Sequence, residues 1–310
     1  MRPPTISTFG ALQQYETKDG SYTLYSEFFN ELFHCPSGAL EETKNKFIYP
    51  AELDRFTQGS KITVLDVCVG LGYNSALLMQ ELRNRNIKLE WRGLEIDCRP
   101  LTIALEEPRF QKNWVPEVID ILKSLRDKDA WDSSGSSGEI LWGDARQQLQ
   151  LLPKNFSADL ILLDAFSPNH CPELWTEEFL CALSSRLAPE GRILTYCRAA
   201  AIRASLRRSG LTLYSLKAPT DQSYNWSMGT MASLPSKNSN GTQPNNSPRW
   251  QSLSLMEEEH LNTRAAVPYR DPKGIDSASR ILKRREEEQI NCAFKTTSAW
   301  QKRWNLGKKR

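Results

Sequence analysis

The chain has 310 residues, of which 39% are hydrophobic, enough for one medium-sized domain with an appended segment. No stretch approaches the roughly 18 consecutive apolar residues of a membrane helix, and the N-terminus lacks the charged-then-apolar pattern of a signal peptide. We therefore expect a cytoplasmic protein with no membrane segment. The net charge of +3 conceals an uneven distribution, because residues 233–310 carry 15 Lys and Arg against 8 Asp and Glu.

Cysteine and histidine usage argues against disulfides and zinc. The seven cysteines include no CxxC pair, and several fall inside apolar patterns, so we interpret them as reduced, structural thiols. Three histidines, His34, His170 and His260, are too scattered to complete a metal cage with these cysteines. We expect no metal cofactor.

The first 60 residues precede the predicted core. Residues 19–25 follow the pattern of a turn and an alternating strand, and residues 27–33 are typical of a helix. We interpret residues 1–60 as a segment that covers the substrate and the cofactor.

Residues 61–232 alternate between strand and helix patterns. Strands are expected near 62–68, 89–96, 139–143, 159–164, 192–197, 211–216 and 227–232, with helices over 74–84, 99–107, 116–126, 175–187 and 199–208. This alternation predicts an α/β fold, a seven-stranded, mostly parallel sheet with helices on both faces and one antiparallel strand. The Ser- and Gly-rich stretch 127–138 predicts a flexible surface loop.

The most informative motif is the apolar strand that runs into Gly70 and Gly72 and then directly into a helix start. Without a Cβ, these glycines let the backbone turn tightly and approach a ligand, toward which the amides of the helix point. A dinucleotide fingerprint requires a third glycine, and Ser75 or Ala76 stands in its place, which argues against NAD. We therefore expect Gly70, Gly72 and Asn74 to form a cofactor loop of another kind.

Acidic residues follow four of the predicted strands. They are Asp66, Glu95, Asp144 and Asp164, and Asp97 stands two residues after Glu95. Because the carboxyl ends of strands in an open α/β sheet form the ligand crevice, we expect these acids to converge on one ligand. S-adenosylmethionine suits them, since it is cationic, offers two ribose hydroxyls and has no phosphate. Any single acid of this kind could instead cap a helix.

The C-terminal part differs in composition from the core. Residues 233–250 are rich in Ser, Asn, Gly and Pro and predict a flexible linker, and residues 251–310 form a basic extension. A short helix is expected over 277–289, followed by Trp300 and Trp304. Basic clusters attract nucleic acid through counterion release, yet such a surface is more often simply solvated, and paired tryptophans more often dock a helix on its own domain.

Residues 164–175, DAFSPNHCPELW, resemble the motif D-x-F-[AS]-P-x-x-x-P-x-[LM]-W of the methyltransferase domain of MnmC, which methylates the aminomethyl group of the tRNA wobble uridine. Further elements of that family occur in the same order. They are Asp19-Gly20-Ser21, Tyr25-Ser26, residues 38–43, the glycine loop and Gly143-Asp144-Ala145. The resemblance covers about residues 17–232.

The resemblance implies a Rossmann-like class I S-adenosylmethionine-dependent methyltransferase. By position, Gly70 and Gly72 approach the methionine part, Glu95 the ribose, Asp144 with Ala145 the adenine, and Glu42 the cofactor or the substrate amine, while Asp164, Phe166 and Pro168 frame the reacting nitrogen. The implied partner is tRNA, through its anticodon wobble uridine. The 310 residues contain no FAD-binding oxidoreductase pattern, and no obligatory protein partner is inferred.

The hypothesis for the chemistry centres on Asp164, which would orient the amine while Phe166 packs the uracil. A water or a carboxylate would take the proton. Trp175 is expected to pack in the core, and Tyr25 with residues 224–226 are candidates for stacking on a splayed-out base.

Two alternatives remain open. A small-molecule amine methyltransferase, or an aminopropyltransferase of the spermidine synthase type, would turn over without RNA. A noncatalytic RNA-binding protein would bind tRNA without transferring a methyl group.

Overall fold

The computed structural model describes residues 9–218, 227–235 and 247–306. The chain divides into two compact units, which are described here one at a time. The first comprises residues 1–166 and 187–195, and the second comprises residues 167–186 and 196–310.

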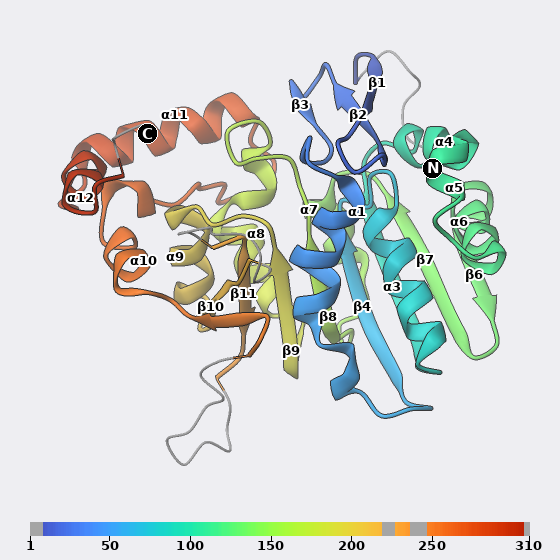
Figure 1. The fold of residues 1–310 in the computed structure, drawn as a ribbon. Helices are drawn as coiled ribbons and strands as arrows, with labels where there is room; N and C mark the ends of the chain where they lie inside the picture. The colour runs from blue at the N-terminus through green and yellow to red at the C-terminus, as the bar shows by residue number, and fades with distance from the viewer. Residues whose placement is uncertain (1–8, 219–226, 236–246, 307–310) are drawn as a thin grey trace. The chain divides into compact units, whose positions relative to one another are not determined.

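The first unit is built on a sheet whose strands follow the order β9-β8-β4-β5-β7-β6 (Figure 1). These strands are β4 Lys61–Val67, β5 Lys88–Glu95, β6 Ala130–Ser133, β7 Ser136–Trp142, β8 Ala158–Leu163 and β9 Leu187–Thr195. All neighbours are parallel except β6, which pairs antiparallel with β7. The central strands β4 and β8 are near-continuous apolar runs, because helices cover a parallel sheet on both faces.

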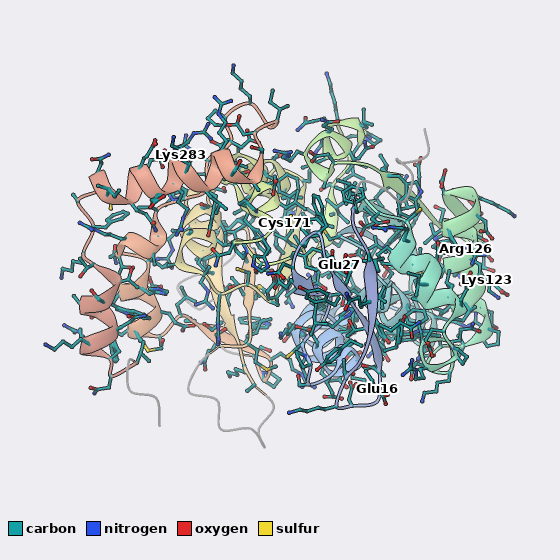
Figure 2. All side chains as sticks on the ribbon, turned by 90° about the horizontal axis from the view of Figure 1, so that it is seen from above. Glu16, Glu27, Lys123, Arg126, Cys171 and Lys283 are labelled. Carbon is teal, nitrogen blue, oxygen red and sulfur yellow. The ribbon has the colours of Figure 1, made fainter. Side chains whose placement is uncertain are left out.

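Helices connect the parallel strands of this sheet. They are α3 Tyr73–Asn84, α4 Arg99–Glu106, α5 Pro108–Gln111, α6 Pro116–Lys128 and α7 Ala145–Leu151. The sequence of α6 shows why it packs as it does, since Val118, Leu122 and Leu125 recur at helical spacing and are buried. Lys123 and Arg126 lie on its outer side (Figure 2). The helix and strand alternation predicted for this part of the core is confirmed.

A small antiparallel sheet precedes the core, with β1 Leu12–Glu16, β2 Tyr22–Ser26 and β3 Glu31–Leu32. The helix predicted over residues 27–33 is wrong. Tyr25 pairs with Leu32 across a tight turn, and Asn30 adopts a left-handed backbone with φ of 50° that no helix accommodates. Four short helical segments follow, namely α1 Ala39–Thr43, the π-helical η1 Lys44–Ile48, α2 Tyr49–Ala51 and the 3-10 turn η2 Leu53–Arg55.

The flexible loop predicted over residues 127–138 is also wrong. This segment forms the β6–β7 hairpin, in which Trp131 pairs with Gly138. Ser134 and Gly135 both have positive φ, at 53° and 80°, as a two-residue hairpin turn requires. The small residues that suggest a loop therefore form the turn of a β-hairpin. Strand β6 is an addition to the strands expected from the sequence.

The second unit contains a three-stranded antiparallel arrangement with β10 between β11 and β12. Its elements are the 3-10 turn η3 Pro172–Trp175, α8 Glu177–Ser184, α9 Ala200–Arg208, β10 Thr212–Leu216, β11 Thr230–Ser233, β12 Trp250–Ser252, α10 Leu255–His260, the 3-10 turn η4 Arg264–Ala266, α11 Ala278–Asn291 and α12 Thr297–Arg303. Strand β12 was not expected. Of the predicted linker 233–250, residues 236–246 lie outside the described residues, whereas Trp250 is buried and begins β12.

The C-terminal extension folds against other parts of the second unit. The predicted helix is present as α11, and the predicted docking of the tryptophan pair is confirmed. The Trp300 indole donates to the Met256 carbonyl at 3.0 Å and stacks on His260 at 4.0 Å, while the Trp304 indole donates to Glu259 at 2.8 Å. Trp175, also in this unit, is fully buried, as expected.

Within the part of the chain that the structure describes, no helix has the length and apolar character needed to cross a membrane. All seven cysteines are free. No group of three or more His, Cys, Asp or Glu side chains among the described residues is placed to hold a metal ion.

Candidate functional site

The glycine loop after β4 is built from residues in left-handed backbone conformations. Cys68, Gly70 and Gly72 have φ of 69°, 56° and 90°. Gly72 precedes the first turn of α3, and a Cβ added there would lie 3.1 Å from Leu101 Cδ1. The glycines are therefore required by both backbone conformation and packing, and they turn the chain from strand to helix within a few residues.

Asp66 lies beneath this loop rather than at its surface. Its side chain is fully buried, and the Ser75 hydroxyl donates to Oδ2 at 2.6 Å. Burial raises the pKa of Asp66 to about 7, against the lowering effect of that hydrogen bond. Asp66 thus connects the end of β4 to the first turn of α3.

Glu95 joins the end of β5 to the same loop. Its Oε2 accepts a hydrogen bond from the Gly70 amide at 2.8 Å, and its Oε1 accepts from the amides of Ile96 and Asp97 at 2.7 and 2.9 Å. Burial raises the pKa of Glu95 to about 6 although these three amides favour the ionised form. Two of the predicted acids therefore meet at the loop.

Asp97 and Asp144 share a different arrangement. Each carboxylate accepts from the amide two residues later and pairs with that residue's guanidinium, Arg99 in one case and Arg146 in the other, both at 2.6 Å. Asp144 caps α7, and Ala145 is buried in its first turn. The helix-cap interpretation of strand-end acids thus holds for Asp144, whose strand end is kept beside β5 by the Gly143 amide bonding to the Glu95 carbonyl at 2.7 Å.

Asp164, Asn74 and Glu42 form a second polar cluster. The Asn74 amide donates to Asp164 Oδ2 at 2.7 Å. Glu42 accepts from the Cys35 amide at 2.6 Å and from the Lys46 ammonium at 2.5 Å. Burial and the charge of Glu42 hold the pKa of Asp164 well above its usual range, opposed by Asn74 and Lys46. This cluster is half-buried, acidic and able to receive a cation.

The N-terminus of α1, the helix that carries Glu42, is capped by side chains that lie earlier in the chain. The amide of Ala39 donates to the Ser21 hydroxyl at 2.9 Å, and the amide of Glu41 donates to Asp19 at 3.3 Å. A Cβ on Gly38 would lie 2.1 Å from Asp19 Oδ2. The two sequence elements around residues 19–21 and 38–43 therefore act together, and their joint role is to place Glu42.

Phe166 belongs to an aromatic cluster that the sequence did not reveal. Its ring stacks on Phe29 at 4.4 Å and meets Phe33 edge to face at 4.8 Å. Phe33 also lies against the glycine loop, since a Cβ on Gly70 would be 3.3 Å from its ring. The one sequence feature that points to this cluster is the Phe28-Phe29 pair, which the sequence pattern assigns to a helix.

One unsatisfied polar atom in this cluster is suited to S-adenosylmethionine. Asn74 Oδ1 is a buried acceptor that has no hydrogen-bond partner, although Nδ2 of the same side chain is bonded. An ammonium group such as that of the methionine part would satisfy it.

Most of the predicted site residues lie in the first unit. Glu42, Asp66, Gly70, Gly72, Asn74, Glu95, Asp97, Asp144, Ala145, Asp164 and Phe166 are all found there. Pro168 belongs to the second unit, and its role stays a prediction, as do the ligand contacts of the others. Tyr25 donates its hydroxyl to Asn30, and residues 224–226 lie outside the described residues.

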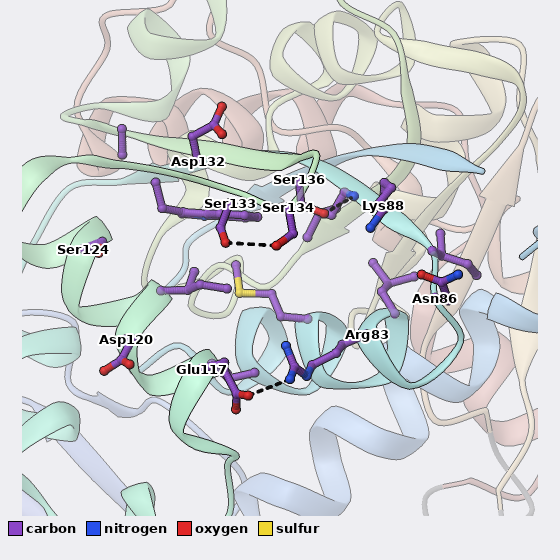
Figure 3. A pocket seen from close by; sticks show the side chains of 18 of the residues that line it. Arg83, Asn86, Lys88, Glu117, Asp120, Ser124, Asp132, Ser133, Ser134 and Ser136 are labelled. Carbon is purple, nitrogen blue, oxygen red and sulfur yellow. Dashed lines mark hydrogen bonds and ion pairs between the residues drawn. The ribbon is translucent and has the colours of Figure 1, made fainter. Parts of the chain in front are cut away.

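A separate cavity of about 720 Å³ lies elsewhere in the first unit (Figure 3). It is lined by the last turns of α3, by α6, by the start of β5 and by the β6–β7 hairpin, with the Arg83–Glu117 ion pair at 2.6 Å among its lining side chains. No predicted site residue lines it. The start of β5 is separated from Glu95 by most of the strand, about 20 Å at the usual rise per residue.

Comparisons with known proteins agree with this geometry. A family model described as S-adenosyl-L-methionine-dependent methyltransferase matches residues 108–223. The crystal structure of MNMC2 from Aquifex aeolicus aligns with a TM-score of 0.74 at 25% identity, covering 92% of this chain and 87% of that chain.

Two curated relatives match over part of their length. An uncharacterized protein of Methanocaldococcus jannaschii is 28% identical over 198 residues, which are 64% of this chain and 54% of the relative. The tRNA 5-methylaminomethyl-2-thiouridine biosynthesis bifunctional protein MnmC of Paraburkholderia phytofirmans is 28% identical over 193 residues, 57% of this chain and 29% of the relative. The chain thus spans about half of the first and under a third of the second. The predicted methyltransferase fold class is confirmed.

Proposed function

We propose that this chain, an MnmC-type S-adenosyl-L-methionine-dependent methyltransferase, converts 5-aminomethyl-(2-thio)uridine at the tRNA wobble position to 5-methylaminomethyl-(2-thio)uridine. The observation that carries the proposal is the Asp164–Asn74–Glu42 cluster, which is acidic, half-buried and adjacent to the glycine loop. The name of the bifunctional relative and the likeness to MNMC2 support the substrate. A tRNA substrate is compatible with the cytoplasmic location expected from the sequence.

The cofactor would lie over the glycine loop. We assign Asn74 Oδ1 to the ammonium, Glu95 to the ribose hydroxyls, and the Asp97 and Asp144–Ala145 strand ends to the adenosine side. Asp66, which is fully buried, would act through the loop that it holds. When bound, S-adenosyl-L-methionine supplies the electrophilic methyl group.

The protein must supply a neutral amine at the right place. An alkyl amine has a pKa of about 10.4, so most of it is protonated at neutral pH. A carboxylate whose pKa is raised is a better proton acceptor than an ordinary one, and burial gives Asp164 that property. Asp164 would therefore hold the ammonium and take its proton, while Asn74 fixes the carboxylate in position.

An acceptor comparison tests this function. The purified full-length protein is incubated with methyl-labelled S-adenosyl-L-methionine and either tRNA bearing the aminomethyl wobble uridine or free amines such as putrescine. We expect label in the tRNA and not in the free amines. Label in free amines alone would favour a small-molecule amine transferase and contradict the proposal.

A further inference from the structure

Four phenylalanine rings form a continuous ladder in the first unit. It begins at Phe9, which meets Phe28 edge to face at 5.3 Å between ring centroids. Phe28 meets Phe29 edge to face at 4.9 Å, and Phe29 stacks on Phe166 at 4.4 Å. Because Phe166 stands two residues after Asp164, the ladder runs from the candidate site to the tip of the β2–β3 hairpin.

Phe28 is presented to solvent by a well-anchored turn. Its side chain is 55% exposed, which is uncommon for a large aromatic residue that packs on its neighbours. The amide of Glu27 donates to the Ala11 carbonyl at 3.1 Å, and the amide of Phe29 donates to the Ser26 hydroxyl at 3.3 Å. The backbone on both sides of Phe28 is thus held by hydrogen bonds, so its exposure is built into the hairpin.

The charge of this surface selects among possible ligands. Glu27 lies beside the ladder (Figure 2), and its carboxylate accepts from the Ala11 amide at 3.2 Å and from the Gln13 side chain at 2.8 Å. A carboxylate repels phosphates, so the hairpin tip is unsuited to the backbone of a nucleic acid. Aromatic rings stack on the faces of unpaired bases, which carry no charge.

We propose that Phe28 is a stacking platform for the unpaired nucleobase that adjoins the target uridine in the anticodon loop. This inference rests on the proposed function and specifies how its RNA substrate is held. Two ring-to-ring steps separate Phe28 from Phe166, so a neighbouring base can engage the hairpin tip while the target uridine is at Asp164. Phe28 would be a substrate-binding residue that favours an opened single strand over an isolated nucleoside.

A fluorescence titration tests the platform. The RNA is an anticodon stem-loop with aminomethyluridine at the wobble position and 2-aminopurine at the adjoining position, whose fluorescence is quenched by stacking. The full-length protein is compared with Phe28→Ala, with Phe28→Trp, which keeps a stacking ring, and with Phe294→Ala, a matched control at an exposed phenylalanine of the second unit.

We expect quenching with the wild type, with Phe28→Trp and with Phe294→Ala, and none with Phe28→Ala. Loss of one base stack should weaken stem-loop binding by about fivefold to a hundredfold. The slope of binding against salt should not change, because no phosphate contact is removed. Affinity and quenching within twofold of wild type in Phe28→Ala would overturn the platform.

The same samples separate this inference from the proposed function. Methyl transfer to the stem-loop without quenching of 2-aminopurine would overturn the platform and leave the reaction standing. Quenching that depends on Phe28, without methyl transfer, would overturn the proposed reaction and leave the platform standing. No binding of the stem-loop by the wild type would contradict both.

Discussion

Asp164 is the residue on which the proposed chemistry depends most. It combines a raised pKa, a fixed hydrogen-bond partner in Asn74 and a second acid, Glu42, near enough to affect its ionisation. Glu42 is itself paired with Lys46, so the cluster brings two acids and one lysine together. These properties suit the binding of a primary ammonium followed by loss of its proton.

Asp164→Asn should lower kcat by about 100-fold to 10,000-fold, the range for loss of a proton acceptor. Because the proposed proton acceptor is the ionised form of Asp164, wild-type activity should fall as pH drops through its raised pKa, and the variant should lack this dependence. Initial rates across pH, with calorimetry of cofactor binding, provide the measurement. Asp120→Asn, an exposed carboxylate on α6, is the matched control. Normal turnover with normal cofactor affinity in Asp164→Asn would rule out this role.

Asp66 gives a prediction for stability rather than rate. Between about pH 4 and pH 7 the unfolded chain ionises Asp66 while the folded chain keeps it protonated, because burial raises its pKa to about 7. The free energy of unfolding should therefore fall as pH rises through this window, by up to about 1.4 kcal/mol per pH unit. Above pH 7 this contribution levels off.

Asp66→Asn removes the titrating group and should flatten this dependence. Urea unfolding of both proteins at about pH 5 and about pH 8 provides the comparison. Glu95, with its pKa raised to about 6, leaves a residual slope of the same sign. Identical pH profiles for the two proteins would show that Asp66 is not protonated in the folded state.

At the scale of elements, sequence patterns predict those helices, strands and loops whose structure depends on residues close together in the chain. The glycine loop, the strands on either side of it and the amphipathic helix α6 are encoded by residues close together in the chain. The hairpin tip at residues 27–30 was misread because apolar residues in a turn resemble a helix face. The β6–β7 hairpin was misread because its strands are short and its Ser- and Gly-rich composition is that of a loop.

The small helix α1 depends on a cap that its own sequence does not supply. Ser21→Ala removes the acceptor of the buried Ala39 amide, which should cost about 1 kcal/mol of unfolding free energy. Ser37→Ala, at an exposed position nearby, should have little effect. Chemical denaturation of the two variants measures the difference. Equal stabilities would mean that Ser21 does not act as the cap.

At the scale of the whole molecule, a buried ion pair connects α9 to α10 within the second unit. Arg203 of α9 is 2% exposed, and its guanidinium donates to Glu257 of α10 at 2.8 Å and to Thr230 of β11 at 2.8 Å. Although burial opposes ionisation, Arg203 holds the pKa of Glu257 below its usual value. The C-terminal extension is therefore tied to the strands of this unit.

Arg203→Met should destabilise the protein by about 3–5 kcal/mol, because it leaves Glu257 buried without its cation. The double variant with Glu257→Gln should be more stable than the single variant, since no uncompensated charge remains. Urea unfolding of the wild type, both single variants and the double variant gives this comparison. A double variant less stable than Arg203→Met would contradict it.

The sequence predicts which residues lie at the site but not the contacts that their side chains make. The strand-end acids can be identified because a parallel sheet gathers the carboxyl ends of its strands. Glu95 contacts the glycine loop, and Asp66 and Asp164 contact the first turn of α3 that follows it. That Asp66 faces inward and that Asp144 is paired with Arg146 depends on side-chain packing, which strand position does not fix. Contacts of Phe29 and Phe33 with Phe166 join segments more than 100 residues apart, beyond the reach of local pattern.

The most direct test of the central claim is nucleoside mass spectrometry after reaction. Transfer RNA carrying 5-aminomethyl-2-thiouridine at the wobble position is incubated with this protein and methyl-labelled S-adenosyl-L-methionine, then digested to nucleosides. The account predicts that this nucleoside gains one labelled methyl group and that the other nucleosides remain unlabelled. If the nucleoside stays unlabelled while cofactor binding is confirmed in the same preparation, the claim is contradicted.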